Sequence, residues 1–226
     1  MLAEATDRPT LSTVSKYMVA TALYTGARLA EIAGLTWDDI NWDFKTIQIN
    51  KTYDWTKQRH SRIEANPFKE TKNMQSHRII KVNGELLTLL KRLKDQQDLG
   101  FHRLHINNPN GLVFLNAQGT VPGSSAVNKT LRAMLRRINV RPKVLDLSFH
   151  GLRHTHASYL LFKGVSIYYI SKRLGHRDIS TTLSVYSHVL NELESKESLK
   201  TLVALSDMRK KTDIARNTTV RKLRTE

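Results

Sequence analysis

The sequence predicts a mainly helical domain with a small antiparallel β-sheet inserted near residues 45–82, which is an α+β fold. Three observations lead to this class. Apolar residues recur at helical spacing along most of the chain, whereas alternation of apolar and polar residues is confined to short stretches. Small polar residues precede the helical segments and glycines follow them. The 226 residues are 40% hydrophobic, which is sufficient for the core of one sizeable domain.

Capping signals mark the helix boundaries. Hydroxyl and amide side chains accept hydrogen bonds from the free N–H groups of a first turn, and glycine adopts the left-handed conformation that often follows a last turn. Ser12 or Thr13 and Asn83 stand at such starts, and Gly26 and Gly100 stand at such ends. On these signals we predict helices at residues 11–26, 27–34, 83–100, 124–138, 148–164, 166–175, 178–190 and 192–208.

Strand signals occupy short runs between these helices. Side chains alternate at residues 46–50, and residues 76–82 form a second predicted strand. The interval at residues 51–75 is polar, basic and poorly periodic, so we expect an exposed hairpin or a long loop there. Residues 111–116 form a short apolar run that predicts a buried strand.

Composition narrows the classes of function. The formal net charge is +16 and no single block of basic residues explains it, so the surface attracts polyanions, nucleic acid first and acidic membrane second. The absence of cysteine excludes disulfides, cysteine zinc sites and thiol nucleophiles. No apolar run approaches roughly eighteen residues and the N-terminus lacks a signal-peptide pattern, so we expect a cytoplasmic protein without a membrane partner.

The stretch SFHGLRHTHAS carries the densest cluster of reactive side chains. His150 and Arg153 lie three residues apart at a predicted helix start, where free N–H groups and the helix dipole favour an anion. Arginine offers a planar fork for two phosphate oxygens, and histidine carries protons near neutral pH. A metal site is an alternative because His154 follows His150 by four residues. The zinc helix HExxH needs a glutamate where this chain has Gly151, so we predict no metal.

Other candidates are ordinary when each is taken alone. Arg28 follows a glycine break, and Glu31 could hold it in a surface salt bridge of about 0.2–0.5 kcal/mol. Lys69 and Lys72 precede a predicted strand and could reach a phosphate from a hairpin. His176 follows the glycine that ends a helix. A tyrosine such as Tyr186 is usually half-buried and satisfied.

The order of these residues is more specific than any one of them. TGARLAEIAGLTWDDI, TKNMQSHR, HGLRHTHAS, LGH and then a tyrosine one short helix later make the chain similar to the tyrosine recombinase (phage integrase) family over residues 12–190. The pattern resembles integrases of phages and conjugative transposons from Gram-positive bacteria. Asn73 follows Lys72 where the family pattern leads us to expect threonine, so Lys69 remains a rival for the lysine role.

The resemblance implies a DNA breaking-rejoining catalytic domain that needs no cofactor or metal. Arg28 and Arg153 would clamp the phosphate, and Tyr186 would attack phosphorus to form a 3′-phosphotyrosine. His150 would assist as base and His176 would hydrogen-bond a phosphate oxygen. A phenol with this task must meet a phosphate, so we expect Tyr186 to be accessible rather than sealed in the core.

Further roles complete this interpretation. Lys72 would protonate the 5′ leaving oxygen, and Glu31 would orient Arg28 or the histidines. We predict DNA contacts for Lys69, Arg78 and Arg177.

The resemblance also implies a domain organisation and partners. The catalytic domain is expected at residues 1–190, with a C-terminal helix and basic tail at residues 191–226, and the family's N-terminal core-binding domain is expected to be absent. The partner would be double-stranded DNA, on which copies form a tetramer by exchange of the C-terminal segment, with a monomer in free solution. The source would be a bacterial phage or mobile element. Alternatives are a type IB topoisomerase, a decayed non-catalytic DNA-binding fragment and a histidine-based metallohydrolase.

Overall fold

The computed structural model of the protein describes residues 1–56, 66–70, 76–140 and 147–187, and positions 189, 190, 194, 198, 200–203, 205 and 206 beyond them. The chain divides into two compact units, Met1–Thr182 and Leu183–Glu226. In the first unit the α-helices with defined bounds are α1 (Leu2–Thr6), α2 (Val14–Thr25), α3 (Leu29–Ala33), α5 (Gly84–Leu104), α6 (Ser124–Arg137), α7 (Phe149–Phe162) and α8 (Ile167–Leu174), and residues 179–182 are helical as well. The strands are β1 (Ile40–Asn41), β2 (Thr46–Ile49), β3 (Lys51–Tyr53), β4 (Phe68–Glu70) and β5 (Arg78–Lys81), and short 3-10 turns lie at Leu11–Thr13 and Trp37–Asp39.

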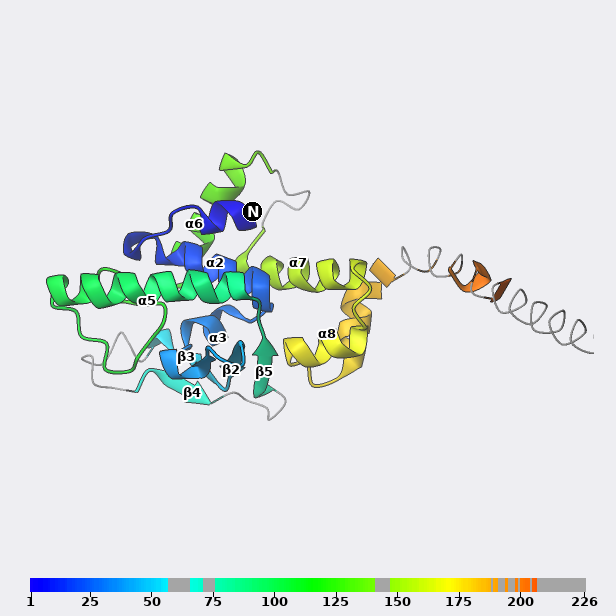
Figure 1. The fold of residues 1–226 in the computed structure, drawn as a ribbon, viewed down its shortest axis with the longest axis horizontal. Coiled ribbons are helices and arrows are strands. Elements are labelled where there is room, and N and C mark those ends of the chain that lie inside the picture. The colour runs from blue at the N-terminus through cyan, green and yellow to red at the C-terminus, as the bar shows by residue number, and fades with distance from the viewer. Residues whose placement is uncertain are drawn as a thin grey trace, which may run out of the picture. The chain divides into compact units, whose positions relative to one another are not determined.

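Helix α2 is the centre of the first unit. It contacts α1, α5, α6 and α7, and Figure 1 shows α5 running beside it. Because other helices surround it, α2 has little surface left for solvent. Its different sides carry fully buried residues, among them Tyr17, Met18, Val19 and Ala22. The helix ends at Gly26, whose left-handed conformation stops it as predicted.

Two small antiparallel sheets lie beside this helical body. One has the strand order β1–β2–β5, and the other pairs β3 with β4. Ile47 pairs with Ile80 on the buried face of the first sheet, whereas Ile79 is 70% exposed on the other face. The strands predicted at residues 46–50 and 76–82 are therefore confirmed, and β3 and β4 show the hairpin pairing expected within residues 51–75.

Two local predictions differ from the structure, and one short helix was not predicted. Helix α5 continues through Gly100 to Leu104, because His105 rather than Gly100 adopts the left-handed cap. A Cβ on Gly100 would stand 2.5 Å from the Leu11 Cδ1 atom, so this glycine permits close packing instead of ending the helix. Residues 111–116 are not a strand but a series of turns, with one bridge from Leu112 to Thr36. Their apolar side chains are nevertheless buried, and Gln97 of α5 donates hydrogen bonds to the carbonyls of Val113 and Leu115. The first helix, α1, was not predicted.

The second unit is helical at every position that the structure describes. Three of its apolar side chains, Leu202, Val203 and Leu205, are more than half exposed. None of the helices in the described part of the chain is long and apolar enough to cross a lipid bilayer.

We predict that Gly26→Ala destabilises the first unit by about 2–4 kcal/mol. The left-handed backbone at φ +67° penalises any Cβ, and this Cβ would stand 2.7 Å from His156 Cδ2 and 2.8 Å from Leu174 Cδ2. Gly84→Ala is the matched control, since nothing lies within 4 Å of its Cβ, and it should be neutral or stabilising by up to about 1 kcal/mol. Urea unfolding of both variants measures the difference, and equal effects would contradict this account of Gly26.

Candidate active site

A neighbouring helix fixes the start of α7. The Asn128 side chain of α6 accepts a hydrogen bond of 2.7 Å from the backbone N–H of Phe149, the first residue of α7. Ser148 occupies the N-cap position without a side-chain cap bond. Because the first turn is held this way, His150 is exposed at the helix start while Arg153 faces the interior. Asn128 was not identified from the sequence, since a cap supplied by another helix has no local signal.

A cavity of about 160 Å³ lies at this helix start. Three predicted residues from distant parts of the chain, Arg28, His150 and Arg153, line it together. Ser124 and Asn128 of α6 complete its polar wall. The N-terminus of α7 and two guanidinium groups concentrate positive charge here, so the cavity suits an anionic oxygen.

Arg153 joins two helix ends. Its guanidinium donates hydrogen bonds to the carbonyl of Gly26 at 2.8 Å and to the carbonyl of Leu174 at 2.7 Å. Only 3% of the residue is exposed. The side chain that lines the cavity is thus also a tie between the end of α2 and the end of α8, and replacing it by alanine would leave two buried carbonyls without this donor.

Glu31 lies between two arginines. One of its carboxylate oxygens accepts from Arg28 Nη1 at 2.9 Å and from Arg78 Nη1 at 3.1 Å. The other accepts from the Arg28 backbone N–H and from Arg78 Nη2, both at 2.8 Å. Burial raises the pKa of the Glu31 carboxyl, but hydrogen bonds and charge from Arg78, together with Arg28, outweigh burial and hold this pKa below its usual value. The Arg28–Glu31 ion pair would be weak on a protein surface. Here the Glu31 side chain is 1% exposed, so its buried carboxylate holds Arg28 in place.

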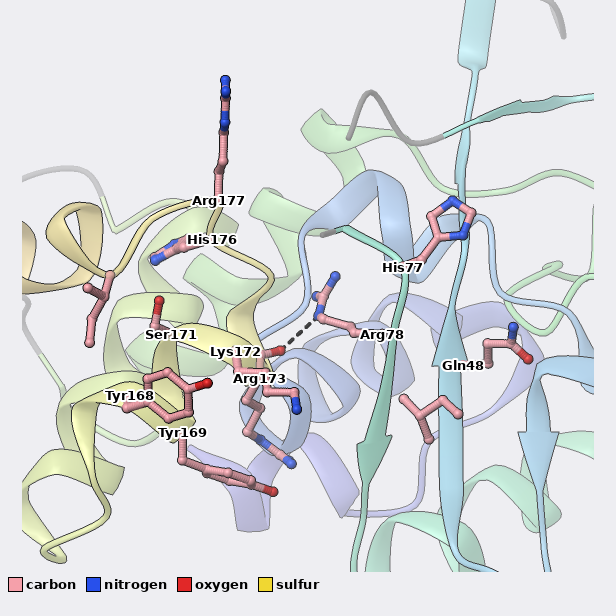
Figure 2. A pocket seen from close by; sticks show the side chains of 12 residues that line it. Gln48, His77, Arg78, Tyr168, Tyr169, Ser171, Lys172, Arg173, His176 and Arg177 are labelled. Atoms are coloured by element: carbon pink, nitrogen blue, oxygen red, sulfur yellow. Dashed lines mark hydrogen bonds between the residues drawn. The ribbon is translucent and has the colours of Figure 1, made fainter. Parts of the chain in front are cut away.

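Arg78 faces the protein rather than solvent. Its side chain is 5% exposed, and its Nε donates to the carbonyl of Arg173 at 2.8 Å, as Figure 2 shows. We predicted a DNA contact for this residue. Its burial and its bonds to Glu31 favour a role within the protein, so the DNA contact forms no part of our proposal.

A half-buried arginine, Arg173, is paired with a histidine that the sequence did not single out. His156 Nδ1 lies 2.8 Å from the carbonyl of Leu23, so it must carry the proton, and Nε2 accepts from Arg173 Nε at 3.1 Å. Arg173 also donates to the carbonyls of Lys81 and Tyr24, both at 2.9 Å. Burial lowers the pKa of His156 to about 4. The one sequence feature that could have indicated His156 is its position on the apolar face of the predicted helix, because a histidine in the core requires hydrogen-bond partners.

His176 lies directly after Gly175, which caps α8 in the left-handed conformation. Its Nδ1 is 2.7 Å from the Thr182 hydroxyl oxygen. Burial and the charges of Arg153, Arg28 and Arg78 lower the pKa of His176 to about 4. The pKa of His150 is lowered as well, by its partial burial and by the charges of His154, Arg153 and Arg28. Both shifts favour the neutral imidazole.

A larger cleft of about 930 Å³ lies between β5 and α8. Figure 2 shows its wall, with His77 on the strand side and Tyr168 and Tyr169 on the helix side. Arg177 also lines the cleft and is exposed next to His176, so its predicted DNA contact is sterically open.

The two lysine candidates have different outcomes. Lys72 lies outside the described residues. Lys69, on β4, is 60% exposed in its side chain and pairs with Asp54 at 2.7 Å. Hydrogen bonds from Lys69 and Thr56 lower the pKa of Asp54 to about 2. The choice between the lysines as proton donor stays a prediction.

Tyr186 belongs to the second unit, where residues 183–187 are helical. Its side chain is 2% exposed, so the accessibility that we expected is wrong for this conformation of the chain. Its role as nucleophile stays a prediction. A tyrosine has an apolar ring that favours burial and a polar hydroxyl group that does not. The polar serines beside Tyr186 in the sequence led us to expect exposure.

The rings of His150 and His154 stand 5.1 Å apart, centroid to centroid. Among the residues that the structure describes, no group of three or more His, Asp or Glu side chains is placed to hold a metal ion.

Fold and site together define a basic, mainly helical domain that gathers Arg28, Arg153 and His150 around one cavity, with His176 at a second cleft. The chain belongs to the phage integrase family, whose family model matches residues 1–192. The resemblance seen in the sequence is thereby confirmed.

Similar proteins agree with this assignment. The integrase of Staphylococcus phage L54a is 33% identical over 187 residues, 79% of this chain and 49% of that protein. The ICEBs1 integrase of Bacillus subtilis is 28% identical over 174 residues, 77% of this chain and 45% of that protein. The chain thus spans about half the length of these relatives.

Solved structures confirm the predicted fold class. XerA recombinase has a TM-score of 0.59 at 22% identity, covering 87% of this chain and 60% of its own. XerH recombinase bound to its difH substrate has a TM-score of 0.60 at 20% identity, covering 86% of this chain and 49% of its own.

The pKa of His156 predicts a stability change in acid. The folded-state pKa of about 4 lies below the ordinary 6.5, so the native state resists a proton that the unfolded state accepts. The stabilisation is complete above pH 6.5 and is lost as the pH falls toward 4, by on the order of 3 kcal/mol for this one group.

Chemical unfolding between pH 7.5 and 4 measures this effect. His156→Gln should weaken the pH dependence and lower the stability at pH 7, because one amide group cannot place a donor at the Leu23 carbonyl and an acceptor at Arg173 as the two imidazole nitrogens do. His102→Asn, at an exposed histidine near the end of α5, should keep the full dependence. An unchanged pH profile in His156→Gln would contradict the pairing.

Proposed function

We propose that this chain is the catalytic domain of a site-specific DNA recombinase that cleaves and rejoins DNA through a 3′-phosphotyrosyl link, without metal or ATP. One observation carries the proposal: Arg28, His150 and Arg153 line a single cavity at the N-terminus of α7. Family membership supports it. So do similar proteins whose solved structures contain DNA, the Tn1549 integrase with circular intermediate DNA and XerH with difH.

The cavity fits the charge of a phosphodiester. An in-line displacement at phosphorus needs positioning and charge stabilisation more than covalent help from the protein. Arg28 and Arg153 would each donate to non-bridging oxygens, and the first N–H groups of α7 would add to that field. These fixed positive groups would take the place of a divalent cation.

The neutral histidines suit the proton transfers. A phenol with a pKa near 10 needs a base, and the lowered pKa of His150 keeps its imidazole able to accept the Tyr186 proton at pH 7. The Tyr186 oxygen would bond to phosphorus as the bond to the 5′ oxygen breaks. That oxygen would take a proton from Lys72 or Lys69, and neutral His176 would donate a hydrogen bond to the phosphate. Attack by a partner strand's 5′ hydroxyl would reverse these steps and release Tyr186.

The proposed nucleophile and the C-terminal segment both belong to the second unit. In this proposal Tyr186 meets the phosphate in the DNA complex. The exposed apolar side chains Leu202, Val203 and Leu205 lie in the segment that we propose docks on a second copy of the chain. In this proposal the free chain is a monomer and the DNA complex a tetramer, which a mass measurement with and without DNA would test.

The proposed chemistry predicts a covalent complex in the absence of metal. The protein is mixed with a nicked suicide substrate carrying the recombination sites of the parent element, in EDTA, and the products are separated on a denaturing gel. We expect a slow-migrating DNA–protein band that Tyr186→Phe abolishes and that the control Tyr168→Phe, at an exposed tyrosine of α8, retains.

Three outcomes would go against the proposal. A band that persists in Tyr186→Phe would show that another residue is the nucleophile. Failure to form any band, even after fusion to a matching core-binding domain, would contradict catalysis and favour a DNA-binding module. Relaxation of supercoiled plasmid by the monomer would assign the chain to the topoisomerase alternative.

A further inference from the structure

We propose that Arg78 is a positioning residue that holds both Arg28 and the turn carrying His176 in place in the active site. Through Glu31 it holds Arg28, and through the carbonyl of Arg173 it holds the turn that carries His176. The consequence for catalysis rests on the proposed function, whereas the positioning itself is a property of the free chain.

Arg78 is placed for this task by strand alternation. In β5 the side chains of Arg78 and Ile80 face the interior, while those of Ile79 and Lys81 face outward. A guanidinium at a core-facing strand position must be satisfied inside the protein, because burying an unpaired charge is costly. Its bonds reach residues 47 and 95 positions away in the chain.

The geometry of the contacts requires arginine. Nη1 and Nη2 donate in parallel to the two oxygens of Glu31, at 3.1 and 2.8 Å. Nε donates sideways to the Arg173 carbonyl at 2.8 Å, and Nη1 also reaches the carbonyl of Ser76 at 3.1 Å. Lysine keeps the charge but has one compact ammonium group, which cannot serve a carboxylate edge and a separate carbonyl in these directions.

The turn before His176 rests on the guanidinium. A Cβ at Gly175 would stand 3.0 Å from Arg78 Nη1 and 3.1 Å from its Cδ, and the backbone there has φ +69°. The glycine therefore allows the chain to pass directly against Arg78. Two residues earlier, the Arg173 carbonyl accepts from Arg78 Nε, the hydrogen bond drawn in Figure 2. Arg78 thus supports this turn by that bond and by its packing against Gly175.

On the other side, Arg78 shares the charge of Glu31. The carboxylate is buried and holds Arg28 by the backbone N–H and by Nη1. Arg28 is the more accessible of the two arginines, with 41% of its side chain exposed against 5% for Arg78. Without Arg78, the full charge of Glu31 would act on Arg28 and draw its guanidinium away from a phosphate. Arg78 thus leaves Arg28 with guanidinium N–H groups that can still bind a phosphate.

The first arm of the test uses the free chain and needs no DNA. In the wild type, NMR of the arginine side chains should show the Arg78 Nε–H protected from exchange and its guanidinium rotation restricted. Arg78→Lys should then shift the Arg28 Nε–H and the His176 ring signals while most other signals stay in place. Lys81→Ala removes a charge from the outward face of the same strand and should leave both signals unchanged. A freely exchanging, rotating Arg78 guanidinium in the wild type would overturn the proposal without any variant.

The second arm measures the rate of covalent complex formation at saturating suicide substrate. Arg78→Lys should lower this rate at least tenfold and change the dissociation constant for DNA less than twofold, while Lys81→Ala should match the wild type. A loss of DNA affinity at an unchanged rate would overturn positioning and make Arg78 a DNA contact. If the wild type forms no covalent complex, the proposed function fails, and the NMR arm still decides whether Arg78 positions these groups.

Discussion

The buried carboxylate of Glu31 is the interaction on which the site depends. A carboxylate removed from water costs several kcal/mol unless charged donors replace its hydration. Here two arginines, one from the break after α2 and one from β5, supply four hydrogen bonds to its two oxygens. This single charge therefore determines where Arg28 and Arg78 lie, and it joins the helical body to the sheet.

Helix C-termini organise the remaining basic groups. The last carbonyls of a helix have no intrahelical donor and carry partial negative charge, so cations are favoured beside them. Arg153 and Arg173 donate to carbonyls at the end of α2, and Arg153 and Arg78 do so at the end of α8. Three arginines thus hold two helix ends together. Their positive charges would otherwise repel one another, but each guanidinium is stabilised by the carbonyls to which it donates. The excess of positive charge around the anion cavity is stable for that reason.

Local signals account for the parts of the fold that the sequence predicted. Caps such as Asn83 and Gly26, and the alternation in β2 and β5, act over a few residues and were sufficient for the helices and the first sheet. The order of the family motifs identified Arg28, His150 and Arg153, which the structure brings to one cavity. Gly100 was misread because a glycine that ends a helix and a glycine that admits a neighbour look the same in a sequence.

Long-range partners lay beyond such reasoning. Arg173 finds its acceptor at Tyr24, 149 positions away, and nothing near either residue indicates the other. The burial of His156 likewise depends on which surfaces meet after folding. In each case the residue type was visible in the sequence, but its partners were set by tertiary contacts.

The most direct measurement of the central claim is the cleavage rate of Glu31→Gln. Glutamine keeps the shape of the side chain and removes its charge, so one amide oxygen must serve two guanidinium groups. The account predicts a rate of covalent complex formation at least tenfold lower, with DNA affinity within twofold of the wild type and with the His156–Arg173 pair intact by NMR. Cleavage by Glu31→Gln at the wild-type rate would contradict it, because the arginines would then be held in place without the carboxylate.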